Sequence, residues 1–361
     1  MTARARLVLL CAAAWACRER APVRPPATSR AALPLAVTPL PPRVARGVSY
    51  AHDWSARGTQ GYGSASDRAQ LDRLRALGAT WVSVTPFGYL RSLEEAEVHA
   101  AYERPGSETD AALTATIREA HARGLRVLLK PHLWVRGSWP GAVDPSDPAR
   151  AAALVQSWGR ITSHYAELAA RESVEALTVG VEMDPLAVRA PQAWRAVIAD
   201  ARARYRGTLT YAANWSSAAE ISFWEALDVV AVNHYAPLAD APGVCAPDVA
   251  ATRARASLAA YAAVGRRCGR PVWLTEVGFR RDARALTEPW TWSRHEPVCE
   301  GDLQSAGYAA TFRAVAEEPV VEAVFLWKWF TSGGEEEEGA TGFVFAGRPA
   351  EAVVRGAFRA P

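Results

Sequence analysis

The sequence lacks the short motifs that mark several common kinds of active site. It has no HExxH pattern and no closely spaced cysteine pair, and its histidines do not recur at helix-face spacing beside a carboxylate. A metal site therefore has little support. A GxGxxG phosphate turn and a GxSxG nucleophile turn are also missing, which removes the usual signatures of dinucleotide binding and of a serine hydrolase. No metal and no cofactor are expected.

A strong net charge is missing from most of the chain, and lysine is almost absent. The formal net charge is +3, but residues 1–46 contain eight arginines and one glutamate, or +7, which leaves −4 for residues 47–361. A folded part with that balance does not favour polyanions, so nucleic acid is not expected as a partner. Only two of the 41 basic residues are lysines, Lys130 and Lys328, and the other 39 are arginines.

The N-terminus has the features of an export signal. An apolar run over 7–16 is about ten residues long, too short to span a bilayer but suited to the core of a signal peptide. Residues 14–17, Ala-Trp-Ala-Cys, resemble a bacterial lipobox, although Ala14 stands where leucine is usual. We expect a signal peptide over 1–17 and an extracytoplasmic protein, either secreted or anchored in the membrane by a lipid on Cys17. A plain secretory signal and an uncleaved leader are the alternatives.

Residues 18–46 are rich in proline, alanine and arginine, a composition typical of a stiff linker that does not fold by itself. The folded domain is therefore expected over 47–361. Export permits a disulfide in this domain. Cys245 and Cys299 fall in segments expected on the same rim of the fold, which makes them a better pair than either with Cys268. Three unpaired thiols are the alternative.

Short apolar runs alternate with longer amphipathic patterns throughout this domain. The runs predict eight strands, at 47–54, 81–89, 126–135, 176–183, 209–215, 227–235, 271–279 and 321–329. Leucines at helical spacing over 66–78, ending in Gly78, predict a helix after the first strand, and similar patterns follow most of the others. Eight strand–helix units predict an α/β fold with a single (β/α)8 TIM barrel. An open doubly wound sheet is the alternative.

The predicted strands end in polar and aromatic residues, although their interiors are apolar. In a (β/α)8 barrel these ends meet at one face, where catalytic residues lie. Charged groups near a barrel mouth cost desolvation free energy and therefore usually have a function. The residues concerned are His52, Asp53, Trp54, Tyr89, Lys130, His132, Trp134, Glu182, Asn214, Trp215, His234, Tyr235, Glu276, Trp327, Lys328 and Trp329.

Two of these residues, Glu182 and Glu276, end the fourth and seventh predicted strands. Barrel geometry brings those two ends to opposite sides of one cleft. Two facing carboxyls can divide the cleavage of a glycosidic bond between a proton donor and a nucleophile. A pair about 5–5.5 Å apart retains the anomeric configuration, and a wider pair inverts it. The alternative for each glutamate, taken alone, is a structural role in a salt bridge at the rim of the barrel.

Several segments resemble glycoside hydrolase family 113, the β-mannanases of clan A. They are GVSYAHDW (47–54), LRALGATWVSVTP (74–86), LLKPHLWV (128–135), SHYAELAARESVEALTVGVEM (163–183), LTYAANW (209–215), AVNHYAPL (231–238) and WLTEVGF (273–279). The resemblance implies that Glu182 is the acid/base, that Glu276 is the nucleophile and that the anomeric configuration is retained. Val181 departs from the wider clan, in which many members have an asparagine that binds the 2-hydroxyl. This difference weakens any inference of a glucan substrate.

The resemblance also implies roles for two aromatic residues. Tyr235 resembles the clan's strand-six tyrosine, whose hydroxyl keeps the nucleophile ionised and oriented. Trp327 resembles the strand-eight tryptophan that lies under the cleaved sugar. A tryptophan suits that place because a pyranose ring presents an apolar face to the indole. Further substrate contacts are expected from Lys130, His132, Asn214, Asp53, Trp54, Trp215 and Lys328. A structural ion pair is the alternative for each lysine.

These features predict a monomeric retaining glycoside hydrolase that cleaves β-1,4-mannosidic bonds in mannan or manno-oligosaccharides by double displacement. Two alternatives stay open. One is another β-linked glycan, or transglycosylation, in the same site. The other is a non-catalytic glycan-binding barrel at the cell surface. Four consecutive glutamates at 335–338, after the last strand, are interpreted as a solvated loop.

Overall fold

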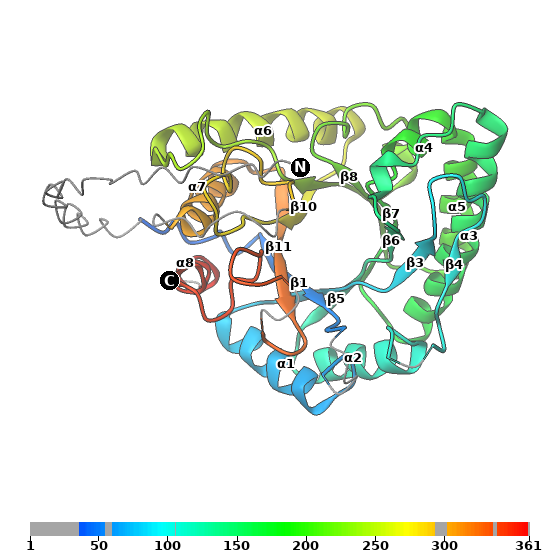
Figure 1. The fold of residues 1–361 in the computed structure, drawn as a ribbon, viewed down its shortest axis with the longest axis horizontal. Helices are drawn as coiled ribbons and strands as arrows, with labels where there is room; N and C mark the ends of the chain where they lie inside the picture. Colours follow the sequence, from blue (N-terminus) through cyan, green and yellow to red (C-terminus); the bar gives the residue numbers. More distant parts are fainter. Residues whose placement is uncertain (1–35, 55–59, 105, 293–301, 335–337, 360–361) are drawn as a thin grey trace, which may run out of the picture. The chain divides into compact units, whose positions relative to one another are not determined.

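Eight parallel strands form a closed barrel. The computed structural model describes residues 36–54, 60–104, 106–292, 302–334 and 338–359. The barrel strands are β1 (Ala45–Ala51), β2 (Trp81–Val84), β5 (Arg126–Leu129), β7 (Ala176–Val181), β8 (Thr208–Asn214), β9 (Val229–His234), β10 (Val272–Val277) and β11 (Val321–Phe330). Each pairs with its neighbours along the chain, and β11 pairs with β1 to close the ring (Figure 1). The predicted (β/α)8 barrel is confirmed, and an open doubly wound sheet is excluded.

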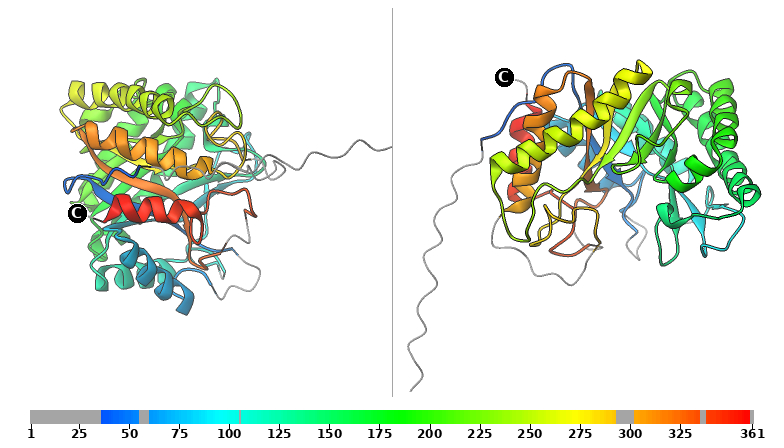
Figure 2. Two further views of the ribbon diagram at one scale, coloured as in Figure 1. Left: turned by 90° about the vertical axis from the view of Figure 1, so that its left-hand side faces the viewer. Right: turned by 90° about the horizontal axis from the view of Figure 1, so that it is seen from above.

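Helices follow the strands and cover the outside of the barrel (Figure 1). They are α1 (Ala65–Leu77), α2 (Asp110–Ala122), α3 (Pro148–Arg171), α4 (Asp184–Arg189), α5 (Pro191–Arg204), α6 (Pro247–Cys268), α7 (Leu303–Glu317) and α8 (Pro349–Phe358). Helix α1 begins where the Ser64 side chain accepts the N–H of Asp67, and it ends at Gly78, whose φ is 103°. On one flank α6, α7 and α8 lie side by side (Figure 2). The short link between β8 and β9 contains the 3-10 helix η2 (Trp224–Ala226).

Aromatic side chains fill the interior of the barrel. Trp81 of β2 contacts Trp273 of β10, with ring centroids 5.5 Å apart, although these strands are not neighbours in the barrel. Phe325 of β11 packs against both rings. Gly47 of β1 provides the space for this ring, because a Cβ atom there would lie 2.2 Å from Phe325 Cδ1. The barrel is thus a packed core that fixes the positions of the strand ends above it.

Two of the predicted strands are interrupted. Residues 81–89 and 126–135 were each expected to form one strand, but each divides at a proline, Pro86 or Pro131. Proline has no N–H to donate to a sheet, so the barrel pairing stops there. The chain continues as β3 (Phe87–Leu90) and β6 (His132–Val135), which pair with each other and, through β3, with β4 (His99–Ala100). This second sheet places His132 and Trp134 beyond the end of the barrel.

The predicted linker extends too far at its C-terminal end. Leu40 and Val44 are buried in the main core, and the N–H of Leu40 donates to the carbonyl of Ala357 at 2.9 Å. The described residues from 36 onward therefore belong to the folded domain, because their apolar side chains pack against it. The predicted signal peptide, the lipid site at Cys17, the rest of the linker and Cys299 of the predicted disulfide lie outside the described residues. Over the described part, no helix is long and apolar enough to cross a membrane.

Candidate active site

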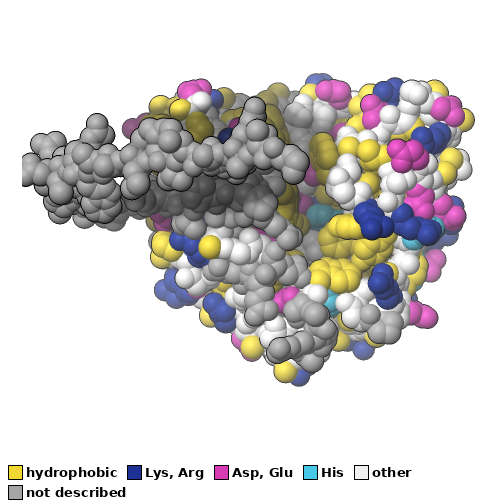
Figure 3. All heavy atoms as spheres, viewed as in Figure 1, with side chains coloured by type: hydrophobic (Ala, Val, Ile, Leu, Met, Phe, Trp, Pro, Cys, Tyr) yellow, Lys and Arg dark blue, Asp and Glu magenta, His cyan; other side chains and the backbone are white. Residues whose placement is uncertain are grey.

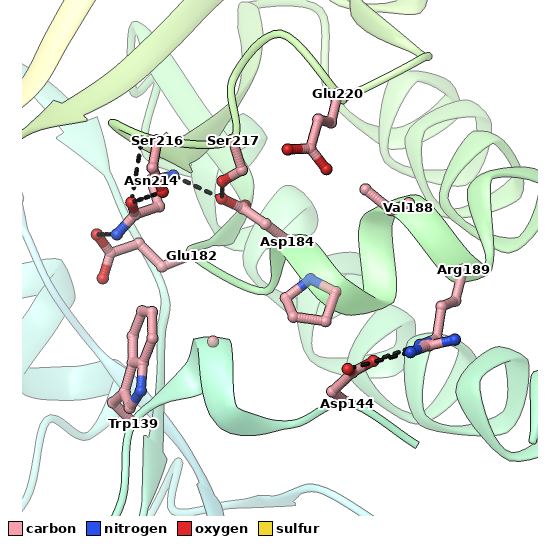
Figure 4. Close-up of a pocket in the computed structure, with 12 residues that line it drawn as sticks. Trp139, Asp144, Glu182, Asp184, Val188, Arg189, Asn214, Ser216, Ser217 and Glu220 are labelled. Carbon is pink, nitrogen blue, oxygen red and sulfur yellow. Dashed lines mark hydrogen bonds and ion pairs between the residues drawn. The ribbon is translucent and has the colours of Figure 1, made fainter. Parts of the chain in front are cut away.

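Glu182 directly follows β7 in an unusual backbone conformation. Its φ is 52°, in the left-handed region that residues with a side chain rarely adopt. Its N–H donates to the carbonyl of Ala212 at 2.8 Å, which ties the turn to β8. The Asn214 amide donates to Glu182 Oε1 at 3.2 Å (Figure 4). A positive φ in a residue with a side chain costs conformational energy. Such conformations cluster at functional sites, where surrounding contacts hold the side chain in one direction.

Glu276 lies within β10 and is 5% exposed. Lys130 Nζ donates to its Oε1 at 2.6 Å, and the Tyr235 hydroxyl donates to its Oε2 at 2.6 Å. Each carboxyl oxygen therefore has a strong donor, one of them a cation. These two bonds fix the plane of the carboxylate at the barrel mouth.

Both glutamates line one cavity of about 880 Å³, which we call the main cavity. Eleven of its 26 lining residues are tryptophan, tyrosine or phenylalanine. Five of the exposed large hydrophobic side chains are tryptophans, and all five line it: Trp54, Trp134, Trp139, Trp290 and Trp292. Hydrophobic side chains gather on the face shown in Figure 3, beside histidine and basic side chains. Exposed apolar area of this kind marks a binding surface, and indole rings suit the flat faces of sugars.

The two carboxyls have different electrostatic environments. The pKa of Glu182 is raised to about 8; burial is the largest cause, and the nearby charges of Glu276 and Asp184 add to it, whereas Lys130 opposes the shift. A carboxyl with that pKa is protonated at neutral pH. Glu276, by contrast, is in direct contact with an ammonium group. Two carboxyls in one cavity with opposed environments can serve as a proton donor and a nucleophile.

Lys130 does not lie where a sugar could reach it. Its side chain is fully buried, and its Nζ donates to Glu276, to the Thr275 carbonyl at 3.1 Å and to the Asn233 side chain at 3.2 Å. An ammonium group has three donors, so none is left for a sugar hydroxyl. This contradicts the expectation that Lys130 binds substrate. The lysine contacts the carboxylate instead.

The other predicted site residues divide into two groups. Seven of them line the main cavity: Trp54, His132, Asn214, Trp215, Tyr235, Trp327 and Lys328. Asp53 is 2% exposed and lies outside the cavity lining; its backbone N–H donates to Thr331 Oγ1 at 3.0 Å. The expectation that Asp53 contacts substrate is therefore not supported by its position. Sequence reasoning could place Asp53 at a strand end but could not give the direction of its side chain.

His132 lies between Trp327 and Glu276. Its ring stacks on Trp327 with centroids 5.7 Å apart and an interplanar angle of 23°, and its Nε2 is 3.8 Å from Glu276 Oε1. Burial lowers the pKa of His132 well below its usual value, and the charges of Lys130 and Lys328 add to the effect. The ring is therefore neutral. Its Nε2 is buried and has no hydrogen-bond partner in the described protein, and the residue lines the main cavity.

Lys328 is held by an ion pair and by aromatic rings. Its Nζ pairs with Glu338 and lies 4.7 Å from the ring centroid of Trp292 and 4.8 Å from that of Trp327. Glu338 is 8% exposed and also accepts the N–H of Phe343 at 2.8 Å. The last of the four consecutive glutamates is thus buried, and its interpretation as part of a solvated loop is wrong. No spacing in the sequence linked it to Lys328.

Asp184 is a further residue that the sequence did not single out. It begins α4, two positions after Glu182, and its carboxylate accepts the Asn214 N–H at 2.8 Å, the Tyr211 hydroxyl at 2.6 Å and the Ser217 hydroxyl (Figure 4). Asp184 therefore positions the residue that contacts Glu182. Among the described residues, no three histidine, cysteine, aspartate or glutamate side chains are grouped so that they could hold a metal ion.

A (β/α)8 barrel with two such carboxyls at the mouth of an aromatic cavity is the arrangement typical of glycoside hydrolases that use a pair of acids. The model of Glycoside Hydrolase Family 113 matches residues 50–347. The chain belongs to this family, and it is a glycoside hydrolase. No curated protein sequence matches it.

Two of the similar solved structures come from the same family, and a third is a GH5_18 protein. The GH113 β-mannanase AaManA from Alicyclobacillus acidocaldarius, in complex with ManMIm, is 26% identical with a TM-score of 0.74, over 86% of this chain and 96% of that one. A GH113 β-1,4-mannanase complex is 24% identical with a TM-score of 0.74, over 88% and 99%. A GH5_18 protein from Bifidobacterium longum subsp. longum, in complex with Manβ1-4GlcNAc, is 14% identical with a TM-score of 0.57, over 87% and 77%. The last two similarities concern the fold alone.

Proposed function

We propose that the protein hydrolyses β-1,4-mannosidic bonds in mannan or manno-oligosaccharides with retention of the anomeric configuration. The observation on which this depends is the pair Glu182 and Glu276, in one cavity and in opposite electrostatic environments. The choice of β-mannan as the substrate comes from family membership and from the similarity to AaManA, whose description names it a β-mannanase.

In the first step the Glu276 carboxylate attacks the anomeric carbon while Glu182 gives its proton to the glycosidic oxygen. The bond to the leaving sugar breaks, and a covalent glycosyl ester forms on Glu276. Lys130 and Tyr235 orient the attacking carboxylate through their bonds to its two oxygens. A protonated Glu182 is available at neutral pH because its pKa is raised to about 8.

In the second step Glu182 takes a proton from water, and the water oxygen attacks the anomeric carbon and releases Glu276. Esterification removes the charge of Glu276, which is one cause of the raised pKa of Glu182. The pKa of Glu182 therefore falls once the ester has formed, and the residue changes from acid to base. Trp327, which lines the same cavity, offers an apolar surface for the sugar that is bound to Glu276 between the two steps.

The test is the substitution Glu276→Ala, with reducing ends measured on β-1,4-mannan and on manno-oligosaccharides. Loss of more than about a thousandfold in kcat is expected, as for other catalytic nucleophiles. Glu322→Ala is a matched control, because Glu322 is exposed on β11 and does not line the main cavity. Undiminished release by Glu276→Ala would remove Glu276 from the mechanism. Proton NMR of the first-formed anomer tests retention.

A further inference from the structure

Asn233 is a buried amide in the same row of residues as the active-site side chains. It lies in β9, and its Cα partners in the neighbouring strands are Asn214 of β8 and Glu276 of β10. Neighbouring strands are about 4.8 Å apart, so these three residues lie side by side at the end of the barrel. Asn233 is 0% exposed and is not among the residues that line the main cavity. It therefore offers no surface to a bound sugar.

The orientation of this amide is set by the groups around its oxygen. Lys130 Nζ donates to Asn233 Oδ1 at 3.2 Å, and the Thr275 hydroxyl donates to the same atom at 3.0 Å. An ammonium group can only donate, so the amide atom that faces it must be the oxygen. The nitrogen end of the amide is therefore turned away from Lys130.

The nitrogen of Asn233 is a buried donor that lacks an acceptor. Within the part of the chain that the structure describes, its Nδ2 has no hydrogen-bond partner. Glu276, on one side of the row, already has a donor on each carboxyl oxygen. On the other side, Asn214 donates to Glu182. A buried N–H without an acceptor costs free energy, so its presence calls for an explanation.

The Asn233 side chain acts on Glu182 as a hydrogen-bond donor does. Burial is the largest cause of the raised pKa of Glu182, and the Asn233 side chain opposes that rise because it favours the charged carboxylate. Hydrogen bonds to a carboxylate are roughly twice as strong as those to a neutral group. An N–H from Asn233 therefore gains little from Glu182 while Glu182 holds its proton, and much more once the proton has left.

We propose that Asn233 is a positioning residue that links the two catalytic carboxyls and stabilises the Glu182 carboxylate as it forms. In the first step Glu182 passes its proton to the glycosidic oxygen, and the carboxylate that remains accepts the Nδ2 N–H of Asn233. The oxygen end of the same amide holds Lys130, which bonds to Glu276. The donor is thus paired in the transition state and unpaired before it, which is the condition under which a contact raises kcat. The inference rests on the proposed function.

Two substrates separate this role from a purely structural one. Mannotetraose has a sugar leaving group that needs the proton of Glu182, whereas β-mannobiosyl fluoride has a fluoride leaving group that needs none. Asn233→Ala removes both ends of the amide, and Asn233→Asp keeps an oxygen for Lys130 but removes the N–H groups. The control is Thr275→Val, which removes a donor to Asn233 Oδ1 and leaves the nitrogen end in place. The measurement is kcat/KM on both substrates from pH 5 to 10.

Both Asn233 variants are expected to lower kcat/KM on mannotetraose at least about tenfold more than on the fluoride, because only the reaction with mannotetraose leaves Glu182 ionised. The alkaline limit of the mannotetraose profile should also move to higher pH, because the Glu182 carboxylate loses a donor that favours it. Thr275→Val should change the two values by the same factor and leave the alkaline limit in place.

Equal losses on the two substrates in the Asn233 variants, no loss on either, or an alkaline limit that stays in place would overturn the inference. Asn233 would then act only by holding Lys130. If Asn233→Ala does not fold, Asn233→Asp, which keeps the size of the side chain, decides the question. Wild-type protein that hydrolyses neither substrate would instead overturn the proposed function, so the two failures are distinguishable.

Discussion

At the scale of the residue, two glutamates have different chemical properties because their surroundings differ. Glu182 and Glu276 line one cavity, but only Glu276 has an ammonium at 2.6 Å. Glu182 has instead a neutral amide at 3.2 Å and two further carboxyls, Asp184 and Glu276, close enough to raise its pKa. Burial is the largest cause of the raised pKa of Glu182, and these two carboxyls add to it, whereas Lys130 opposes the shift.

This environment predicts an alkaline limit to catalysis. With a pKa of about 8, Glu182 loses its proton as pH rises through that value, so kcat/KM on manno-oligosaccharides should fall above about pH 8. The measurement is kcat/KM from pH 5 to 10. β-Mannobiosyl fluoride, which needs no proton donor, should show little of this limit. A limit that persists unchanged in Glu182→Gln would assign it to another group.

Lys130 gives a second prediction at this scale. Since it contacts Glu276 and not the cavity, Lys130→Met should lower kcat by about a hundredfold and change KM little. A variant that raises KM and leaves kcat unchanged would show that Lys130 binds substrate after all.

Eleven of the sixteen residues predicted at the strand ends line the main cavity, but the sequence did not show which way each side chain points. Lys130 and His132 are two positions apart at a strand end, yet Pro131 between them ends the barrel strand and starts a second sheet. One side chain then enters the packed interior and the other lines the cavity. The roles implied for Glu182, Glu276 and Tyr235 depended on a shared motif and needed no such detail.

At the scale of the element, the strands and helices followed from periodicity and from their caps. The contacts between loops could not be predicted, because residues that meet across two loops have no regular spacing in the sequence. Glu338 lies in the loop after β11 and pairs with Lys328 near the end of β11, while Lys328 also covers Trp292 from the loop after β10. These contacts fasten two loops to one wall of the main cavity.

Removing one partner of this ion pair should lower the unfolding free energy more than removing both partners. Both side chains are more than nine-tenths buried, so Lys328→Met or Glu338→Gln leaves one buried charge without its partner. Each single variant should lose about 3–5 kcal/mol of unfolding free energy, and the double variant should lose less than either. Denaturant unfolding of the four proteins measures this cycle. Additive losses would mean that the pair does not couple the loops.

At the scale of the whole molecule, we propose that the chain is exported and anchored by a lipid on Cys17. The apolar run at 7–16, the cysteine and the proline-rich segment after it are the basis for this proposal. In a bacterial host, the full chain should appear in the membrane fraction and incorporate labelled palmitate. Cys17→Ser should abolish the label and leave mannanase activity unchanged. Activity confined to the cytoplasm of the host would contradict export.

The active site should also lower the stability of the fold in a pH-dependent way. The pKa of Glu182 is raised in the folded protein to about 8, above its usual value of 4.5. The folded state therefore binds this proton more tightly than the unfolded chain does, and this contribution to stability is lost as pH rises from about 4.5 to about 8. At higher pH Glu182 is a carboxylate in a partly buried position, where the nearby charges of Glu276 and Asp184 disfavour its charged form.

Glu182→Gln removes that charge and keeps an amide of similar shape. Its Tm should exceed that of the wild type by a few °C at pH 8.5, and the difference should shrink toward zero near pH 4.5. Glu322→Gln, at an exposed position, should show no such trend. A Tm difference that is constant with pH would mean that the gain does not come from the titration of Glu182. With the expected result, a substitution that removes the proposed catalytic acid also stabilises the barrel, because the raised pKa that makes Glu182 an acid is itself a cost to the folded state.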